Sequence, residues 1–284
     1  MLSWFSLLLI STFLAAITAI FQKVILDNKA DPIFFSSYWQ LITAFISVIS
    51  VLLFGFEADS IKILVFAFIC TGLFYGLGTY LFFIGLKNAE ASMASIMNQV
   101  RVIWVLIGSF IFFKEQITLN KLGGVSLIIA GIFIVFHKGL SLRLKRPQRL
   151  ILLSTLFFSL GMLADKYFIN FFNSYTYLVI DFLAPSLFII IISPQIIKDY
   201  KNIKPFSKNN ILTVLVACVF FGSILAMLTA YKLGAEVSIA VPIFQSAVVL
   251  VVLLSAVFLG ERDNLFRKMI GSLVTVFGVC LLSL

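Results

Sequence analysis

One arginine stands near the centre of a long apolar stretch of this sequence. Arg101 lies within the apolar run 91–113. If that run crosses a membrane, a charge at its middle costs about 2.5–3.5 kcal/mol on insertion scales, so the side chain should face the protein interior. A guanidinium group binds a carboxylate through two parallel hydrogen bonds. The position predicts a docking point for a substrate carboxylate. The alternative is an ion pair with Asp165 or Asp181 that only joins helices.

Two acidic residues interrupt later apolar stretches. Asp165 lies in the run 149–172, and Asp181 lies in the run 176–197. Ionisable groups inside a membrane commonly serve proton relays, so both residues are candidates for proton coupling. The alternatives are a local pair between Asp165 and its neighbours and an interfacial position for Asp181 near the start of its helix.

Amide and aromatic side chains near these charges are candidates to line the same cavity. Asn98 shares a helical face with Arg101 and with either Trp104 or Val105, because residues three and four apart lie on one side of a helix. Their alternative roles are hydrogen bonds between helices and, for aromatic rings, contact with lipid. The predicted substrate-binding residues are Arg101, Asn98, Trp104, Gln245, Tyr75 and Tyr231.

The composition shows what kind of element must position these residues. Apolar residues make up 62% of the 284 and charged residues only 12%. Mean hydropathy is +1.14. A soluble domain has about 25% charged residues, so a chain this apolar needs lipid as solvent for most of its surface. A spanning helix takes roughly 20 apolar residues, which predicts an all-α integral membrane protein with ten transmembrane helices. The expected spans are 3–26, 33–54, 61–86, 91–113, 119–137, 149–172, 176–197, 210–233, 237–259 and 266–284.

The two halves of the sequence resemble each other. The segment Ala-Glu-Ala-Ser-Met-Ala at 89–94 matches Ala-Glu-Val-Ser-Ile-Ala at 235–240, an offset of 146 residues. At the same offset Gln99 matches Gln245 and Glu115 matches Glu261. Further equivalent positions, after small gaps, are Lys23 and Lys166, Gly124 and Gly271, and Gly131 and Gly278. The ordered series predicts an internal repeat.

Five helices in each half make the repeat inverted. An odd number of spans forces the two copies to point in opposite directions, an arrangement that secondary transporters use for alternating access. The predicted units are residues 1–137, a basic linker at 138–148, and residues 149–284. One side of the predicted topology carries 15 of the 21 Lys and Arg residues. Positive residues stay inside, so the linker region 138–149 is predicted to be cytoplasmic.

Other functions find little support in the sequence. The net charge of +9 arises from residues between apolar runs, which indicates lipid headgroups and excludes nucleic acid as the expected partner. The three cysteines lie singly inside apolar runs without Cys/His clusters, so no metal or cofactor is expected. No nucleophile cluster suggests an enzyme, and no Walker A sequence suggests ATP binding. Monomer and homodimer both remain open.

The paired segments resemble a known family. Ala-Glu-Ala-Ser followed by Phe-Phe-Lys-Glu at 112–115, and Ala-Glu-Val-Ser followed by Phe-Leu-Gly-Glu at 258–261, are similar to the ten-helix, EamA-domain branch of the drug/metabolite transporter superfamily. The resemblance covers nearly the whole chain. It implies ATP-independent transport of amino acids, related metabolites or drugs. It also implies the inner membrane of a bacterium.

Together, these features predict a secondary transporter for small polar metabolites, either zwitterions or organic anions, working by alternating access and most consistent with export. Its expected partners are the bilayer, the substrate and, as a candidate coupling ion, the proton. A multidrug exporter of lipophilic cations is the main alternative. An intramembrane enzyme and a channel are weaker ones, because scattered single polar residues do not form a charged ring.

Overall fold

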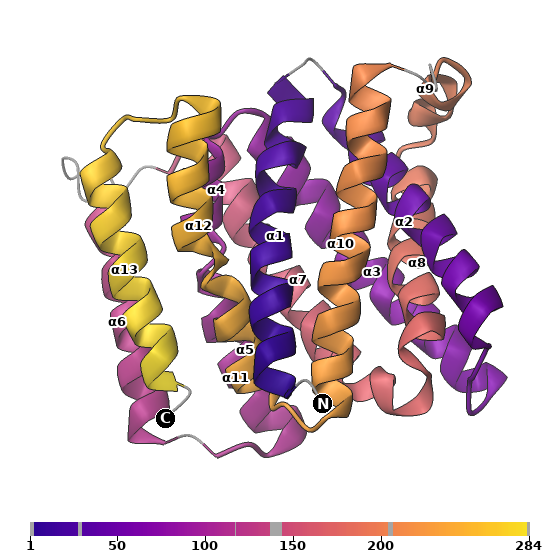
Figure 1. The fold of residues 1–284 in the computed structure, drawn as a ribbon, viewed down its shortest axis with the longest axis horizontal. Helices are drawn as coiled ribbons and strands as arrows, with labels where there is room; N and C mark the ends of the chain where they lie inside the picture. The colour runs from indigo at the N-terminus through magenta and orange to yellow at the C-terminus, as the bar shows by residue number, and fades with distance from the viewer. Residues whose placement is uncertain (1–2, 28–29, 117, 137–143, 204–206, 283–284) are drawn as a thin grey trace.

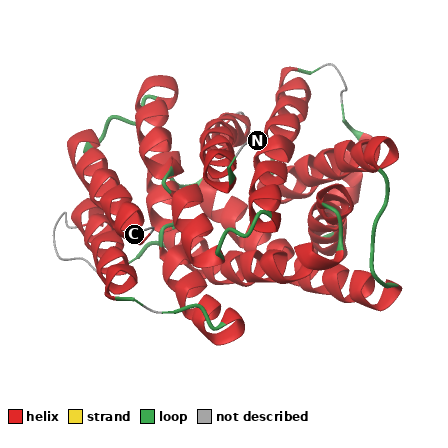
Figure 2. Ribbon diagram, turned by 60° about the horizontal axis from the view of Figure 1, so that its bottom comes forward, coloured by secondary structure: helices red, strands yellow, loops and turns green. Residues whose placement is uncertain are grey.

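The computed structural model describes residues 3–27, 30–116, 118–136, 144–203 and 207–282. These residues are almost entirely helical (Figures 1 and 2), and no strand occurs in the described ranges apart from the isolated bridge between Ala58 and Phe172. The all-α prediction is confirmed.

The first half contains six helices, of which α2 (Pro32–Phe54) and α3 (Ile61–Lys87) begin at a capping side chain. At the start of α2 the Asp31 carboxylate accepts hydrogen bonds from the amides of Ile33 and Phe34, and Pro32 occupies the first helical position. The helices are α1 (Trp4–Asp27), α2 (Pro32–Phe54), α3 (Ile61–Lys87), α4 (Ala91–Met97), α5 (Val100–Phe113) and α6 (Leu119–Phe136).

The second half begins earlier than predicted. Helix α7 starts at Arg146, inside the predicted linker 138–148, and residues 138–143 of that linker lie outside the described ranges. Pro147 suits the first turn of a helix, where its missing N–H costs nothing. The elements are α7 (Arg146–Phe168), η1 (Ile169–Phe171), α8 (Ser174–Ile192), η2 (Pro194–Ile196), α9 (Ile197–Lys201), α10 (Lys208–Lys232), α11 (Val237–Gln245), α12 (Ala247–Leu254), the π-helical turn η3 (Ser255–Leu259) and α13 (Leu265–Leu282).

Two predicted continuous helices are broken, which corrects the sequence prediction. The run 91–113 is interrupted between α4 and α5, and the run 237–259 between α11 and α12. At the first break the amides of Gln99 and Val102 bond to carbonyls three residues back, which tightens the turn. The second break follows Pro242, which supplies no backbone N–H. Both breaks fall near the middle of a run rather than at its ends.

Helices pack between the halves in a regular order. Helix α1 packs on α10, α3 on α7, α2 on α8 and α6 on α13. Figure 1 shows α6 and α13 side by side at one edge of the molecule. Buried serines join two of these pairs: Ser11 Oγ lies 3.3 Å from Ser223 Oγ, and Ser37 Oγ lies 2.9 Å from Ser186 Oγ. Hydrogen bonds between helices replace the missing hydrophobic drive in lipid.

Glycines allow α6 and α13 to approach closely. A Cβ on Gly131 would lie 2.5 Å from the carbonyl oxygen of Gly271, and a Cβ on Gly278 would lie 2.5 Å from that of Gly124. These distances are too short for any side chain. These glycines therefore allow close helix packing.

The outer surface is apolar. Leu52 is 79% exposed and Phe277 is 70% exposed. Eight helical segments are long and apolar enough to cross a membrane, and α6 adds a shorter apolar stretch at Leu119–Gly131. Their positions agree with eight of the ten predicted spans. Helices α6 and α13 occupy the remaining two places, so the ten-span count stays a prediction.

Candidate functional site

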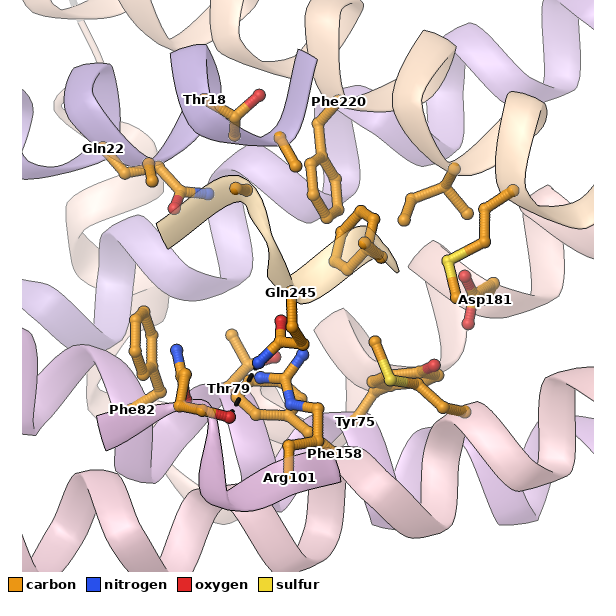
Figure 3. Close-up of a pocket in the computed structure, with 18 of the residues that line it drawn as sticks. Thr18, Gln22, Tyr75, Thr79, Phe82, Arg101, Phe158, Asp181, Phe220 and Gln245 are labelled. Atoms are coloured by element: carbon orange, nitrogen blue, oxygen red, sulfur yellow. Dashed lines mark hydrogen bonds between the residues drawn. The ribbon is translucent and has the colours of Figure 1, made fainter. Parts of the chain in front are cut away.

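A cavity of about 190 Å³ lies in the interior, where helices from both halves meet. Figure 3 shows Arg101, Gln245, Tyr75 and Asp181 among the side chains around it. Helix α1 contributes Ala15, Thr18, Ala19 and Gln22, and the remaining residues come from α2, α3, α4, α5, α7, α8, α10, α11 and α12. The lining brings together six of the eight predicted substrate-binding and proton-coupling residues: Arg101, Asn98, Gln245, Tyr75, Asp165 and Asp181.

Arg101 is buried at this cavity without a carboxylate partner. It is 7% exposed, and its Cζ atom lies 4.4 Å from the centroid of the Phe158 ring. The ion pairs of the described residues are Lys23–Asp27, Lys121–Glu236 and Lys268–Glu90, so the predicted alternative of a structural pair with Asp165 or Asp181 is not observed there. The Nε atom of Arg101 has no hydrogen-bond partner in the described structure. Its donors are available to a ligand.

The two helix breaks meet at the cavity. The Gln245 side-chain amide donates to the carbonyl oxygen of Asn98 at 2.7 Å, and the Gln99 amide donates to the carbonyl oxygen of Gln245 at 2.8 Å. Each glutamine therefore satisfies a carbonyl near the break in the other half. The Asn98 Oδ1 atom is buried and lacks a partner among the described residues. Asn98 thus presents an unused acceptor beside Arg101.

Asp165 is held by two tyrosines. Its Oδ1 accepts a hydrogen bond from the Tyr177 hydroxyl at 2.8 Å, and its Oδ2 accepts one from the Tyr75 hydroxyl. The neighbouring Lys166 points elsewhere, with its Nζ 2.7 Å from the carbonyl oxygen of Ala235. The predicted local pair of Asp165 with this neighbour is therefore absent, and the tyrosines fix the carboxylate in place.

Asp181 faces the cavity with an unpaired carboxylate oxygen. It is 6% exposed, and its Oδ1 has no hydrogen-bond partner in the described part of the chain. The indole Nε1 of Trp39, which also lines the cavity, has none either. Buried polar atoms are normally paired, so unpaired ones in a cavity need an explanation. Here a bound molecule or water would pair them.

The profile of the EamA-like transporter family matches this sequence twice, over residues 2–137 and 148–284. The chain belongs to the EamA-like transporter family. The resemblance to the drug/metabolite transporter superfamily is confirmed. This EamA-like transporter is an integral membrane protein, and it contacts the bilayer and a small-molecule substrate.

Comparison with other proteins supports the fold of the EamA-like transporter. A solved structure described only as "Crystal structure of protein" aligns with a TM-score of 0.69 at 15% sequence identity, over 97% of this chain and 96% of that chain. At this identity the likeness shows the fold alone. Among the curated proteins, none matches the sequence.

Two predicted binding residues of the EamA-like transporter lie away from the cavity. Trp104 is 40% exposed on the apolar exterior, and Val105 instead takes the buried place, at 0% exposed. Arg101 and Val105 lie four residues apart on the buried face of α5, so of the two residues left open by the spacing, Val105 and not Trp104 shares the face of Arg101. Tyr231 is 2% exposed, but it lies outside the cavity lining, where Lys166 Nζ is 5.5 Å from its ring centroid.

Further residues that line the cavity could not be identified from the sequence. Gln22, Thr79 and Phe158 lie within apolar runs, and nothing in the local sequence distinguishes them from residues that only pack. Phe158 could be found only through the contact between its ring and the Arg101 guanidinium. In the described residues, no group of three or more His, Cys, Asp or Glu side chains could hold a metal ion.

Proposed function

We propose that this EamA-like transporter moves a small carboxylate-bearing metabolite, such as an amino acid or a related organic anion or zwitterion, out of the cell. The observation that carries this proposal is the buried Arg101 guanidinium, which lines the cavity without a carboxylate partner. A buried charge without a partner is costly unless a ligand pairs with it. A carboxylate is the ligand that fits a guanidinium best.

The cavity lining offers both a negative and a positive side chain, which favours a zwitterion as ligand. Asp181 offers an unpaired carboxylate oxygen to an ammonium group, while Arg101 and the Trp39 indole offer donors. The volume of about 190 Å³ is below the roughly 300–1,000 Å³ that is usual for drug-sized ligands. A small metabolite with both charges and an apolar body would satisfy these groups together.

The arrangement of the halves supports alternating access. In the pairs α1–α10 and α3–α7, the first helix of one half packs on the third span of the other, and α2–α8 and α6–α13 pair equivalent spans. This order is what two inverted five-helix repeats related by a pseudo-twofold axis produce. Asp165 and Asp181 are the proposed proton-coupling groups. We place the transporter in a bacterial plasma membrane with the region 138–149 in the cytoplasm.

The proposal is tested by metabolite export. Cells that express the wild-type chain, Arg101→Ala or Trp104→Ala at matched membrane levels are compared with empty cells by mass spectrometry of the medium. We expect carboxylate-bearing metabolites to accumulate with wild type and with Trp104→Ala, which removes an exterior side chain of the same helix, but not with Arg101→Ala. Equal export by Arg101→Ala and wild type would refute the role of Arg101.

A multidrug exporter remains the second candidate because of the aromatic lining. Aromatic faces and two carboxylates suit a lipophilic cation. If cations are the substrate, removal of the Arg101 charge should raise rather than abolish resistance of growing cells to cationic dyes. The aromatic residues that line the cavity are Trp39, Tyr75, Phe82, Phe83, Phe158, Phe182, Phe220 and Phe244.

A further inference from the structure

Two short helices that line the cavity are anchored at opposite ends of the molecule. Helix α4 contributes Asn98 at its C-terminal cap, and α11 contributes Gln245. Figure 1 shows the α12–α13 loop at one end of the bundle and the α10–α11 loop at the other. A glutamate from the opposite half of the chain holds the start of each short helix.

The first anchor, here named the Glu261 clasp, joins α4 to the α12–α13 loop. The Glu261 carboxylate accepts hydrogen bonds from the Ala91 amide at 2.7 Å and from the Ser92 amide at 3.0 Å. It also accepts one from the Ser92 hydroxyl at 2.6 Å. Beside it, Lys268 Nζ lies 2.5 Å from Glu90 Oε2. The clasp therefore combines three hydrogen bonds with an ion pair.

The second anchor, the Glu115 clasp, joins α11 to the α5–α6 loop. The Glu115 carboxylate accepts from the Val237 amide at 3.3 Å and from the Ser238 amide at 3.2 Å. Lys121 Nζ lies 3.6 Å from Glu236 Oε2. Charge-assisted N–H···O bonds are usually about 2.7–2.9 Å long, so this clasp is loosely formed.

The two clasps contain the same residue types at equivalent positions of the repeat. Glu115 and Glu261 are 146 residues apart, and so are Ser92 and Ser238. Glu261 also accepts a hydrogen bond from the hydroxyl of Ser92 at 2.6 Å, whereas the described residues show no equivalent bond from the hydroxyl of Ser238 to Glu115. The same set of residues thus forms short, complete hydrogen bonds at one end of the molecule and longer, fewer ones at the other. The local sequence does not explain this difference, whereas two conformations of the contact would.

The helix breaks make such a difference mechanically possible. Helix α4 is separated from α5 at Asn98–Gln99, and α11 from α12 at Ser246, so each short helix can tilt about its break. If α4 moves away from the α12–α13 loop, the Glu261 clasp must open. If α11 moves away from the α5–α6 loop, the Glu115 clasp must open.

We infer that the Glu261 clasp closes the cavity toward the α12–α13 face, that the Glu115 clasp closes it toward the opposite face, and that one clasp completes as the other loosens. Glu261, Ser92 and Lys268, with Glu115, Ser238 and Lys121, are therefore positioning residues for access to the cavity. This inference concerns which face is open, and it does not depend on the substrate proposed above.

The test measures access to the cavity from each face. Thr79, which lines the cavity from α3, is replaced by cysteine in a background without Cys70, Cys218 and Cys280. A membrane-impermeant maleimide is applied to one face or the other of sealed vesicles. We expect Glu261→Gln to raise labelling from the α12–α13 face by roughly tenfold, and Glu115→Gln to raise it from the opposite face, because each loses charge-assisted bonds. Glu57→Gln in an exposed loop is the matched control and should change neither.

Two results would overturn the inference. Labelling that is unchanged in both variants, or raised from the same face in both, contradicts an alternating pair. Where a variant fails to reach the membrane, cysteines at Ser92 and Glu261 joined by a short bifunctional thiol reagent provide a second test. The joined protein should lose labelling of Thr79→Cys from the α12–α13 face only, and undiminished labelling from that face would refute the Glu261 clasp. Labelling measures access to the cavity and the export assay measures the role of Arg101, so either proposal can be refuted without the other.

Discussion

Gln99 and Gln245 exchange hydrogen bonds across the centre of the molecule. The side-chain amide of Gln99 donates to the backbone carbonyl oxygen of Gln245 at 2.8 Å. The side-chain amide of Gln245 donates to the backbone carbonyl oxygen of Asn98 at 2.7 Å. The two glutamines occupy equivalent positions of the repeat, so each half supplies the partner for the helix break of the other. This contact joins the two broken helices at the cavity.

Replacing either glutamine with leucine should destabilise the protein. Gln99→Leu leaves the Gln245 carbonyl buried without its partner, which costs about 1–3 kcal/mol. We expect a lower midpoint of thermal unfolding for Gln99→Leu and Gln245→Leu in detergent. Asn170→Ala, whose side chain bonds only within its own exposed turn, is the control and should stay within about 0.5 kcal/mol of wild type. Wild-type stability of both leucine variants would contradict the exchange.

Loss of the Tyr177 hydroxyl should destabilise the protein. Tyr177→Phe removes the 2.8 Å hydrogen bond to Asp165 Oδ1 and leaves a buried carboxylate oxygen unpaired. The expected loss is about 1–3 kcal/mol in the free energy of unfolding. Tyr167→Phe is the matched control, because that side chain is half exposed. The idea fails if the two variants unfold at the same temperature.

The contact between α6 and α13 should not tolerate a single methyl group. Gly131→Ala and Gly278→Ala each place a Cβ about 2.5 Å from a backbone carbonyl oxygen, and overpacking of this kind costs about 1–3 kcal/mol. Gly222→Ala in α10 meets its nearest neighbour at 3.5 Å and should be neutral or stabilising by up to about 1 kcal/mol. Unfolding midpoints that move in the same direction for all three would contradict this packing.

Lys114 carries a backbone cost that its repeat equivalent avoids. It adopts φ 56° at the end of α5, and Gly260 adopts φ 69° at the end of η3. A left-handed conformation costs a non-glycine residue roughly 1–2 kcal/mol. Lys114→Gly should therefore stabilise the protein by about 1 kcal/mol, and Gly260→Ala should destabilise it by a similar amount. Both shifts can be read from thermal unfolding, and a destabilised Lys114→Gly would show that its side chain matters more than its backbone.

A lysine at position 101 should not replace the arginine. Arg101→Lys keeps the positive charge but loses the planar pair of donors, so the carboxylate of a substrate is held less tightly. We expect KM for export to rise by roughly tenfold or more, the effect of losing one charged hydrogen bond, with a smaller change in the maximal rate. Unchanged KM would mean that only the charge at this position is used.

Patterns along the chain were enough to predict several features. Apolar runs of about 20 residues predict spanning helices, because in lipid every backbone polar group must be satisfied within the segment. The offset of 146 residues between Gln99 and Gln245, with the paired glycines, predicts the repeat. The burial of Arg101 follows from the cost of exposing a charge to lipid. These are properties of residue type and spacing, and a single sequence contains them.

Only the tertiary structure decided which side chains meet. The spacing left Trp104 and Val105 as alternatives on the face of Arg101, and the packing of α5 buries Val105 and exposes Trp104. Tyr75 from α3 and Tyr177 from α8 bond one carboxylate although they are distant in sequence. Glu115 and Glu261 match in the sequence only as repeat positions, but in the structure each caps a helix of the other half. Such contacts depend on how helices from two halves pack, and the free energy of that packing is shared among many residues rather than encoded near any one of them.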